Sequence, residues 1–283
     1  MFRHRKGKQV PSQKKVPRAQ TSFVETTSGR IHVACAGEGY PVLLLHQTPR
    51  SWDEYRDVLP ILGHSFRAIA MDTPGFGASD GLPDGQVSIE AWARTALAVL
   101  DALGIAEAAV VGHHTGAAIA VEVAAAAPQR VSALVLSACP YVDAARREKH
   151  GKAQVVDDVE VSVDGGHLAE LWQRRQPLYP VGDTELLTRF MIDALRAGPL
   201  AAEGHRAVNR YVMEERIGLL RCPTLVLAPR ADPHAYPAAA RVAQAIAGSV
   251  LREVEGAMVP FPDQMPETFA ALVRDFIAQR VGT

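Results

Sequence analysis

Residues Val110–Ala124 read VVGHHTGAAIAVEVA, a short apolar run that passes through a glycine-flanked turn into a segment of small residues. The β-branched residues before the turn are typical of a buried strand, and the alanine-rich residues after it are typical of a helix. Gly112 and Gly116 stand where strand and helix would cross, and glycine lets two backbones approach closely. The stretch predicts a strand that passes through a short turn at His113 and His114 into a helix.

The same alternation of strand and helix extends over most of the chain. Apolar runs typical of strands covered on both faces are separated by segments with helical periodicity. This order predicts an α/β fold with a mostly parallel central sheet and helices on both faces. The expected strands lie in 23–37, 41–46, 66–72, 108–113, 132–138, 223–229 and 250–256, and the expected helices in 51–62, 88–103, 117–127, 235–248 and 266–279.

The alternation stops after Pro140 and resumes near residue 221. The intervening segments are charged and aromatic, with helical patterns in 167–179, 184–198 and 205–218. We therefore expect a core formed by 21–140 and 221–283 and a helical cap, 141–220, over the carboxyl edge of the sheet. Residues 1–20 hold seven Lys and Arg and no acid, which is typical of a flexible basic arm.

Composition narrows the class of protein. With 283 residues, 48% apolar and 22% charged, the chain is long enough for one large domain with a subdomain. Without the seven basic residues of the arm, the 30 basic residues fall to 23 against 31 acidic ones, the reverse of the balance in nucleic-acid binders. No apolar run reaches eighteen residues and no secretory signal is evident, so we expect neither a membrane span nor membrane binding.

The cysteines and short motifs give no indication of a cofactor. Three widely spaced cysteines without a C-x-x-C pair favour reduced thiols and a cytoplasmic location. No H-x-x-x-H or H-E-x-x-H spacing predicts a metal, and the segment GFGASDG is not a dinucleotide-binding G-x-G-x-x-G. The expected partner is a small molecule, and the oligomeric state stays open.

Five segments in order resemble the α/β-hydrolase superfamily, over about Phe23 to Ile277. LLLHQTP is similar to its oxyanion-hole strand and loop, MDTPGFGASD to the D-x-P-G-x-G-x-S segment, and VVGHHTGA to its nucleophile elbow. PTLVLAPRADPHAYP resembles the strand and loop that carry the acid. VEGAMVPFPDQMPETFAALVRDFI resembles the region of the usual histidine base.

The resemblance implies a nucleophile, a histidine base and an acid, and the chain departs from this set at two of the three positions. Asp232 matches the acid, but His114 stands at the nucleophile position and Met258 at the base position. No histidine follows His234, so an acyl-serine mechanism is not expected. The resemblance also implies an oxyanion hole formed by the backbone N–H groups of Thr48 and Thr115.

One hypothesis joins the two substitutions. An imidazole reaches further from the elbow than a serine hydroxyl, so His114 and Asp232 are predicted to form a dyad with Met258 packed beside it. Such a histidine would act as a general base in hydrolysis or in lyase-type cleavage, with a covalent intermediate on His114 as a further alternative.

The expected substrate is small and largely apolar, with a carbonyl-like group, and should lie beneath the cap. We expect His46, Gln47, Met258 and Trp172 to border its pocket, with Gln47 replacing the family's glycine. His46 is also expected to stabilise its loop, and His113 to be a packed, structural histidine. Two alternatives remain open: an inactive hydrolase-like protein that binds a small molecule, and a protein-interaction role that would require an exposed apolar patch on the cap.

Overall fold

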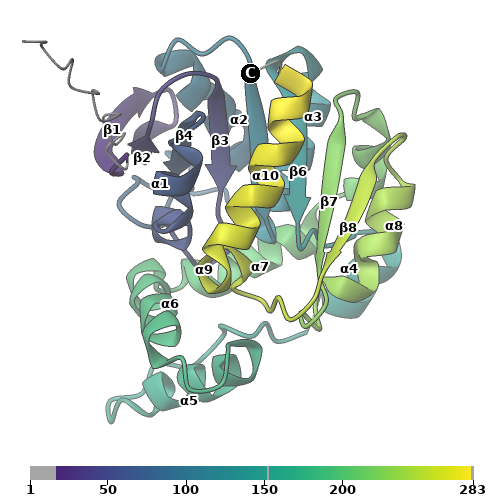
Figure 1. Cartoon of the computed structure of the whole chain (residues 1–283). Coiled ribbons are helices and arrows are strands. Elements are labelled where there is room, and N and C mark those ends of the chain that lie inside the picture. The colour runs from purple at the N-terminus through teal and green to yellow at the C-terminus, as the bar shows by residue number, and fades with distance from the viewer. Residues whose placement is uncertain (1–16, 152, 282–283) are drawn as a thin grey trace, which may run out of the picture.

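A computed structural model describes residues 17–151 and 153–281, and in this part of the chain an eight-stranded sheet forms the centre (Figure 1). The strand order is β1-β2-β4-β3-β5-β6-β7-β8. β2 is antiparallel to β1 and β4, and the other neighbours are parallel, which confirms the predicted mostly parallel sheet. The strands are β1 (Gln20–Thr26), β2 (Gly29–Ala36), β3 (Pro41–Leu45), β4 (Arg67–Met71), β5 (Ala108–His113), β6 (Val131–Ser137), β7 (Thr224–Pro229) and β8 (Val250–Val254).

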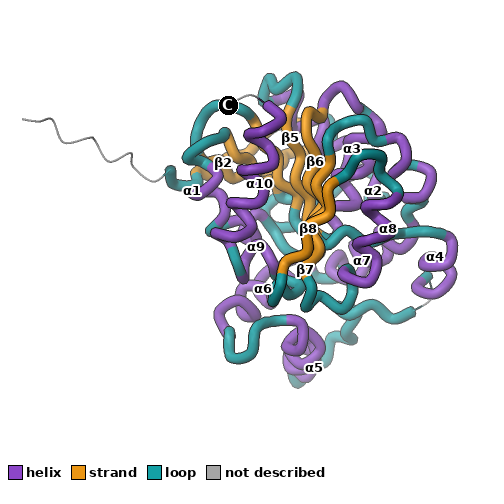
Figure 2. Tube along the Cα trace, turned by 45° about the vertical axis from the view of Figure 1, so that its right-hand side comes forward, coloured by secondary structure: helices purple, strands orange, loops and turns teal. Residues whose placement is uncertain are grey.

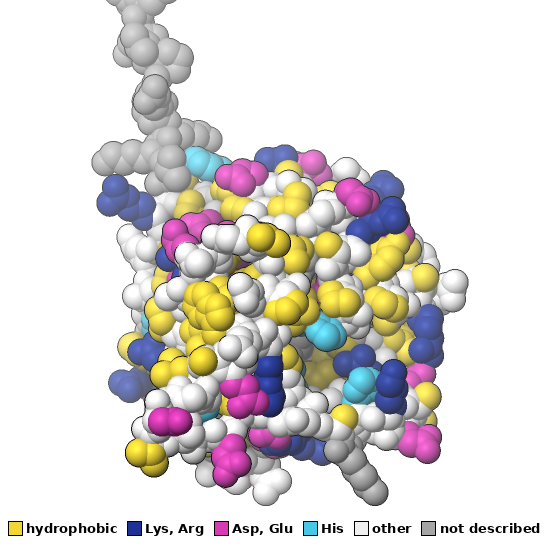
Figure 3. Space-filling model, turned by 90° about the horizontal axis from the view of Figure 1, so that it is seen from below, with side chains coloured by type: hydrophobic (Ala, Val, Ile, Leu, Met, Phe, Trp, Pro, Cys, Tyr) yellow, Lys and Arg dark blue, Asp and Glu magenta, His cyan; other side chains and the backbone are white. Residues whose placement is uncertain are grey.

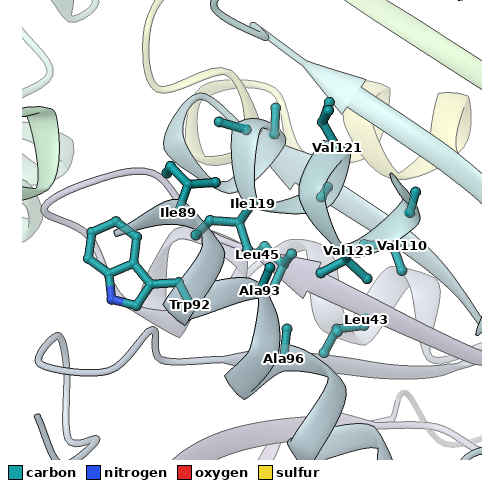
Figure 4. Close-up of a cluster of buried hydrophobic side chains, with 14 of the residues drawn as sticks. Leu43, Leu45, Ile89, Trp92, Ala93, Ala96, Val110, Ile119, Val121 and Val123 are labelled. Carbon is teal, nitrogen blue, oxygen red and sulfur yellow. The ribbon is translucent and has the colours of Figure 1, made fainter. Parts of the chain in front are cut away.

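Helices cover both faces of the sheet, as predicted (Figure 2). Side chains alternate across a strand, so Leu43 and Leu45 of β3 pack on α2 and α3 while Val42 and Leu44 face α1 and α10. Figure 4 shows the first of these layers, where the Trp92 ring of α2 closes the cluster. The covering helices are α1 (Val58–Leu62), α2 (Ile89–Ala102), α3 (Thr115–Ala126), α8 (Ala239–Gln244), α9 (Phe261–Gln264) and α10 (Pro266–Val281).

The helix expected over 51–62 is divided in two. A 3-10 turn spans Trp52–Tyr55, and α1 begins only at Val58. The turn is fixed by contacts to the sheet edge, because the Trp52 N–H donates to Asp72 over 2.6 Å and the Tyr55 hydroxyl donates to the Leu45 carbonyl over 2.9 Å. These anchors hold the chain in a tighter turn than a continuous helix would take.

In the described part of the segment between β6 and β7, the chain forms four α-helices. They are α4 (Ala144–His150), α5 (Gly166–Arg175), α6 (Thr184–Ala197) and α7 (Leu200–Arg210), of which α4 was not predicted. α5 and α6 form a small apolar cluster of their own and lie beyond the sheet in Figure 1, whereas α7 packs on α3. None of the described helices is long and apolar enough to cross a bilayer. Residues 1–16 of the predicted basic arm lie outside the described residues, and its last residue, Gln20, belongs to β1.

The turn between β5 and α3 is packed so closely that two of its residues have no space for a side chain. A Cβ at Gly116 would lie 1.9 Å from the Leu45 carbonyl oxygen, and one at Gly112 would lie 2.2 Å from the Gly116 carbonyl oxygen. Between them His114 has φ 48° and ψ −111°, a conformation that non-glycine residues rarely adopt. The close approach of three backbones therefore holds His114 in a strained geometry.

We predict that Gly116→Ala lowers the free energy of unfolding by about 2–4 kcal/mol, because the new methyl group overlaps the β3 backbone. In an ordinary helix the same change stabilises by about 1 kcal/mol. Denaturant unfolding measures the difference, with Gly218→Ala as the control, since a Cβ there meets no described atom within 4 Å. A Gly116→Ala protein as stable as the wild type would contradict the packing described.

Candidate active site

The structure brings His114 and Asp232 together at the carboxyl end of the sheet. His114 follows β5 and Asp232 follows β7, and His114 Nε2 lies 2.7 Å from Asp232 Oδ2. The ring N–H direction is not aligned with that oxygen, so the contact is a close electrostatic pair and not a well-directed hydrogen bond. Asp232 is fully buried, and its Oδ1 accepts hydrogen bonds from the N–H groups of His234 and Ala235 over 2.8 and 3.0 Å.

These partners determine the charge of the carboxylate. Burial alone raises the pKa of Asp232, but the neighbouring His114 ring and the two backbone N–H groups outweigh it and hold this pKa well below its usual range. Asp232 is therefore ionised at neutral pH. A fixed anion beside an imidazole restricts the orientation of the ring.

The two residues whose N–H groups are expected to form an oxyanion hole border the same cavity as His114. Thr48 lies in the loop after β3, and Thr115 is the first residue of α3, where helix N–H groups have no partner within the helix. Within 17–151 and 153–281 neither N–H donates to a protein acceptor. Both groups are thus available to an oxygen atom of a ligand.

Gln47 borders the cavity, but its polar groups are engaged elsewhere. Its N–H and its side-chain amide donate to the two carboxylate oxygens of buried Glu54 over 2.9 and 2.7 Å. Burial raises the pKa of Glu54 to about 8, against the lowering effect of Arg50 and of these two donors. The Gln47 side chain, which replaces the family's glycine, is thereby held against the 3-10 turn Trp52–Tyr55.

His46 and His113 are buried and hold loops in place. His46 Nε2 accepts from the Thr73 N–H over 2.9 Å, and its Nδ1 lies 2.8 Å from the Gln47 carbonyl oxygen. His113 Nε2 lies 2.8 Å from the Val259 carbonyl oxygen and Nδ1 2.9 Å from the Ser137 hydroxyl. Burial lowers the pKa of both, for His113 to about 3 with a further contribution from His114, so both rings are neutral.

A cavity of about 800 Å³ opens beside His114, within the range typical of small-molecule sites. On the face that Figure 3 shows, histidine and Lys or Arg side chains gather around a hollow. Gln47, Thr48, His114 and Thr115 line the cavity, together with residues of α4, α5 and α7. The other residues expected there, His46, Met258 and Trp172, are absent from its lining as far as the structure describes the chain, and Val259 faces the cavity instead of Met258.

A second histidine–carboxylate pair lies in the segment between β6 and β7. His205 Nε2 of α7 is 2.8 Å from Asp157 Oδ2, and Arg175 of α5 donates to both oxygens of the same carboxylate. Burial raises the pKa of Asp157, but Arg175 and His205 outweigh it and bring the value to about 2. His205 and Arg175 border the cavity. Sequence reasoning missed Asp157 because it lies in a loop with neither helical nor strand periodicity.

A buried charge network joins α6 to the core. Arg50 Nε contacts Asp193 over 3.1 Å and its terminal nitrogen contacts Asp263 over 3.3 Å. Arg189 of α6 contacts the same Asp263 over 2.8 Å and Asp53 over 2.7 Å. Burial raises the pKa of Asp263 to about 6 although both arginines lower it. The network ties the loop after β3, the inserted helices and α9 together.

The family of this chain is established by comparison with known proteins. The model of the alpha/beta hydrolase fold family matches residues 40–233, more than half of the chain, so the chain belongs to this family. In the described ranges no three His, Cys, Asp or Glu side chains are grouped so that they could hold a metal ion.

Particular relatives share parts of the sequence. A 2-hydroxymuconate semialdehyde hydrolase of a Pseudomonas species is 38% identical over 38% of this chain and 39% of its own length. A soluble epoxide hydrolase of a Corynebacterium species is 37% identical over 32% of each chain. The match therefore spans less than half of these relatives.

Solved structures share the fold over nearly the whole chain. An enol-lactonase from Burkholderia xenovorans has a TM-score of 0.74 at 20% identity, covering 91% of this chain and 100% of that one. A thermophilic esterase from Thermogutta terrifontis has a TM-score of 0.76 at 24% identity, covering 92% and 99%. A meta-cleavage product hydrolase from Pseudomonas fluorescens has a TM-score of 0.75 at 21% identity, covering 91% and 97%.

We predict that His113 makes stability fall on acidification. Its folded pKa, about 3, lies below the unfolded value near 6.5, so the unfolded state binds an extra proton between these values. Its contribution is intact above about pH 6.5 and declines by up to about 1.4 kcal/mol per pH unit towards pH 3. In His113→Gln the free energy of unfolding should be lower at pH 7 but less dependent on pH.

Denaturant unfolding at several pH values measures this slope. Exposed His64 provides the control, because His64→Gln should reproduce the wild-type curve. Parallel curves for the wild type and His113→Gln would show that His113 does not remain neutral in the folded protein.

Proposed function

We propose that this protein is an enzyme of the α/β-hydrolase family that cleaves a small carbonyl-containing substrate, with His114 as general base in place of a serine nucleophile. The observation that carries the proposal is the 2.7 Å contact of His114 with buried, ionised Asp232 at the strand-to-helix turn, facing a cavity of about 800 Å³. The helices α4–α7 act as the cap that encloses the substrate.

In this proposal the two ring nitrogens of His114 have different roles. Nε2 faces Asp232, which leaves Nδ1 to accept a proton from water or from an acidic group of the substrate. In hydrolysis the water oxygen then attacks the carbonyl carbon, and the imidazolium returns its proton to the leaving group. In lyase-type cleavage the substrate itself loses the proton and a carbon–carbon or carbon–oxygen bond breaks.

In this proposal the negative charge that develops on the substrate oxygen is stabilised by two backbone N–H groups. The free N–H groups of Thr48 and Thr115 border the cavity beside His114, and donors of this kind stabilise an oxyanion in the transition state. Asp232 stabilises the imidazolium that forms at the same time. The substrate oxygen is thus the group that the two N–H donors bind.

The relatives support the class of reaction. Their names describe hydrolysis of a semialdehyde, an epoxide, a lactone, an ester or a meta-cleavage product, all small molecules. The three cysteines, all unpaired in the structure, support a cytoplasmic location.

A second candidate function is small-molecule binding without turnover. It is favoured by Met258 at the position where the family carries its base, and by the imperfect alignment of the His114 ring with Asp232. In this alternative the cavity retains its ligand unchanged.

The test is turnover of a panel of esters, lactones, thioesters, β-diketones and epoxides, followed by mass spectrometry. We predict that His114→Ala lowers kcat/KM by about 1000-fold, because the neighbouring His113 ring is held by Ser137 and Val259, and that Asp232→Asn lowers it by about 100-fold. Exposed His64→Ala serves as the matched control and should retain wild-type activity.

The outcomes separate the two functions. Full activity in both His114→Ala and Asp232→Asn would exclude His114 as the base. Selective retention of one compound by the wild type, with no product from any compound, would favour the binding protein.

A further inference from the structure

One wall of the cavity is strongly basic. Arg146, Lys149 and His150 of α4 border it, at spacings of three and four residues that place them on one side of the helix. Arg175 and Arg241 border it as well. The described lining contains a single acidic side chain, Asp143, so positive charge predominates.

Some of these cations already have a counter-ion. Arg175 is paired with Asp157, and Arg241 contacts Asp143 over 2.5 Å. Arg146 and Lys149 form no ion pair with any carboxylate in the described residues. These two side chains therefore carry the unbalanced charge of the wall.

Arg146 is the more informative of the two because part of its guanidinium is buried. Its Nε is inaccessible to solvent and, in the part of the chain that the structure describes, has no hydrogen-bond partner. Burying a charged donor without a partner costs free energy, so an unpaired group of this kind calls for a partner from outside the protein, such as a ligand or water. Burial also lowers the pKa of Arg146, which shows the cost of its desolvation.

The pKa of His150 is also affected by the positive charge of this wall. Burial lowers its pKa, and the nearby cations Arg146 and Lys149 lower it further. The three side chains are therefore close enough to repel one another. An anion placed among them would relieve this repulsion and satisfy the Arg146 donor.

We propose that the basic wall binds a carboxylate, so that the substrate is a small carbonyl compound carrying a carboxylate group, with Arg146 as its principal contact and Lys149 as a weaker one. The position of the reacting carbonyl rests on the function proposed above, whereas the carboxylate site does not. The planar guanidinium offers paired N–H donors that match the two oxygens of a carboxylate. His114 and α4 border the same cavity, so one molecule can contact both.

The test compares levulinate, which carries a ketone and a carboxylate, with methyl levulinate, its neutral ester. Ligand-observed NMR at concentrations up to about 10 mM detects binding in the millimolar range. We expect the wild type to bind levulinate at least about 10-fold more tightly than the ester, and Arg146→Gln to abolish this preference. Lys149→Gln should reduce the preference less, and exposed Arg94→Gln, the matched control, should leave it unchanged.

A second measurement distinguishes a ligand contact from a structural role. If Arg146 serves the ligand, Arg146→Met removes an unsatisfied buried charge and the Tm of the free protein stays the same or rises. A substantial fall in Tm, equal affinity for levulinate and its ester, or no binding of levulinate at the highest concentration would each overturn the proposal.

His114→Ala separates this proposal from the proposed reaction. It should lose turnover but keep the preference for levulinate over the ester. A preference for the carboxylate in a protein without any turnover would refute the enzyme and support the carboxylate site.

Discussion

The site depends on one steric constraint, the contact of α3 with the strands beneath it. The Gly116 backbone lies against the Leu45 carbonyl, and no side chain fits between them. This contact compels the chain to turn within the few residues between β5 and α3, which forces positive φ on His114. The same turn presents the Thr115 N–H and the His114 ring on one side. Geometry that would be costly elsewhere is imposed here by backbone packing.

Under the proposed function, the substitutions at His114 and Met258 can be understood as one change. The elbow would then carry the imidazole that the family places in the loop after β8, and this ring contacts Asp232 from the side of the elbow. The loop after β8 no longer needs a polar side chain at Met258. It is fixed instead by its backbone, since the Met258 N–H donates to Gln264 over 2.7 Å and His113 contacts the Val259 carbonyl. The neutral His113 ring thereby supports the position of its neighbour.

Sequence periodicity predicted the parallel sheet and the covering helices because both arise from local patterns. The pairing of His114 with Asp232 came instead from the resemblance to the α/β-hydrolase superfamily and from the reach of an imidazole, and the structure places the two residues after β5 and β7, on either side of β6. The orientation of Trp172 and Met258 could not be obtained in this way, because it depends on how loops and inserted helices pack. α4 was missed because its charged residues carry no apolar face, and with it the basic wall of the cavity.

The contacts of Arg50 could not be predicted from local sequence patterns either. Its partners lie 143 and 213 residues further along the chain, and a buried ion network is visible only after the segments have assembled. Single charged residues in a sequence are usually solvated, so nothing in the sequence indicated that Arg50 and its carboxylate partners are buried.

The ion network around Arg50 connects the inserted helices to the loop after β3. Arg50 is two residues from Thr48, and the Thr48 side chain itself lies so close to α7 that a Cβ at Gly204 would approach it to 2.5 Å. A rigid displacement of α6 and α7 would therefore pull on the loop that carries the Thr48 amide. Under the proposed function, lifting the inserted helices to release a product would at the same time displace the Thr48 N–H from an oxyanion, so that only the closed protein would have the geometry for the reaction.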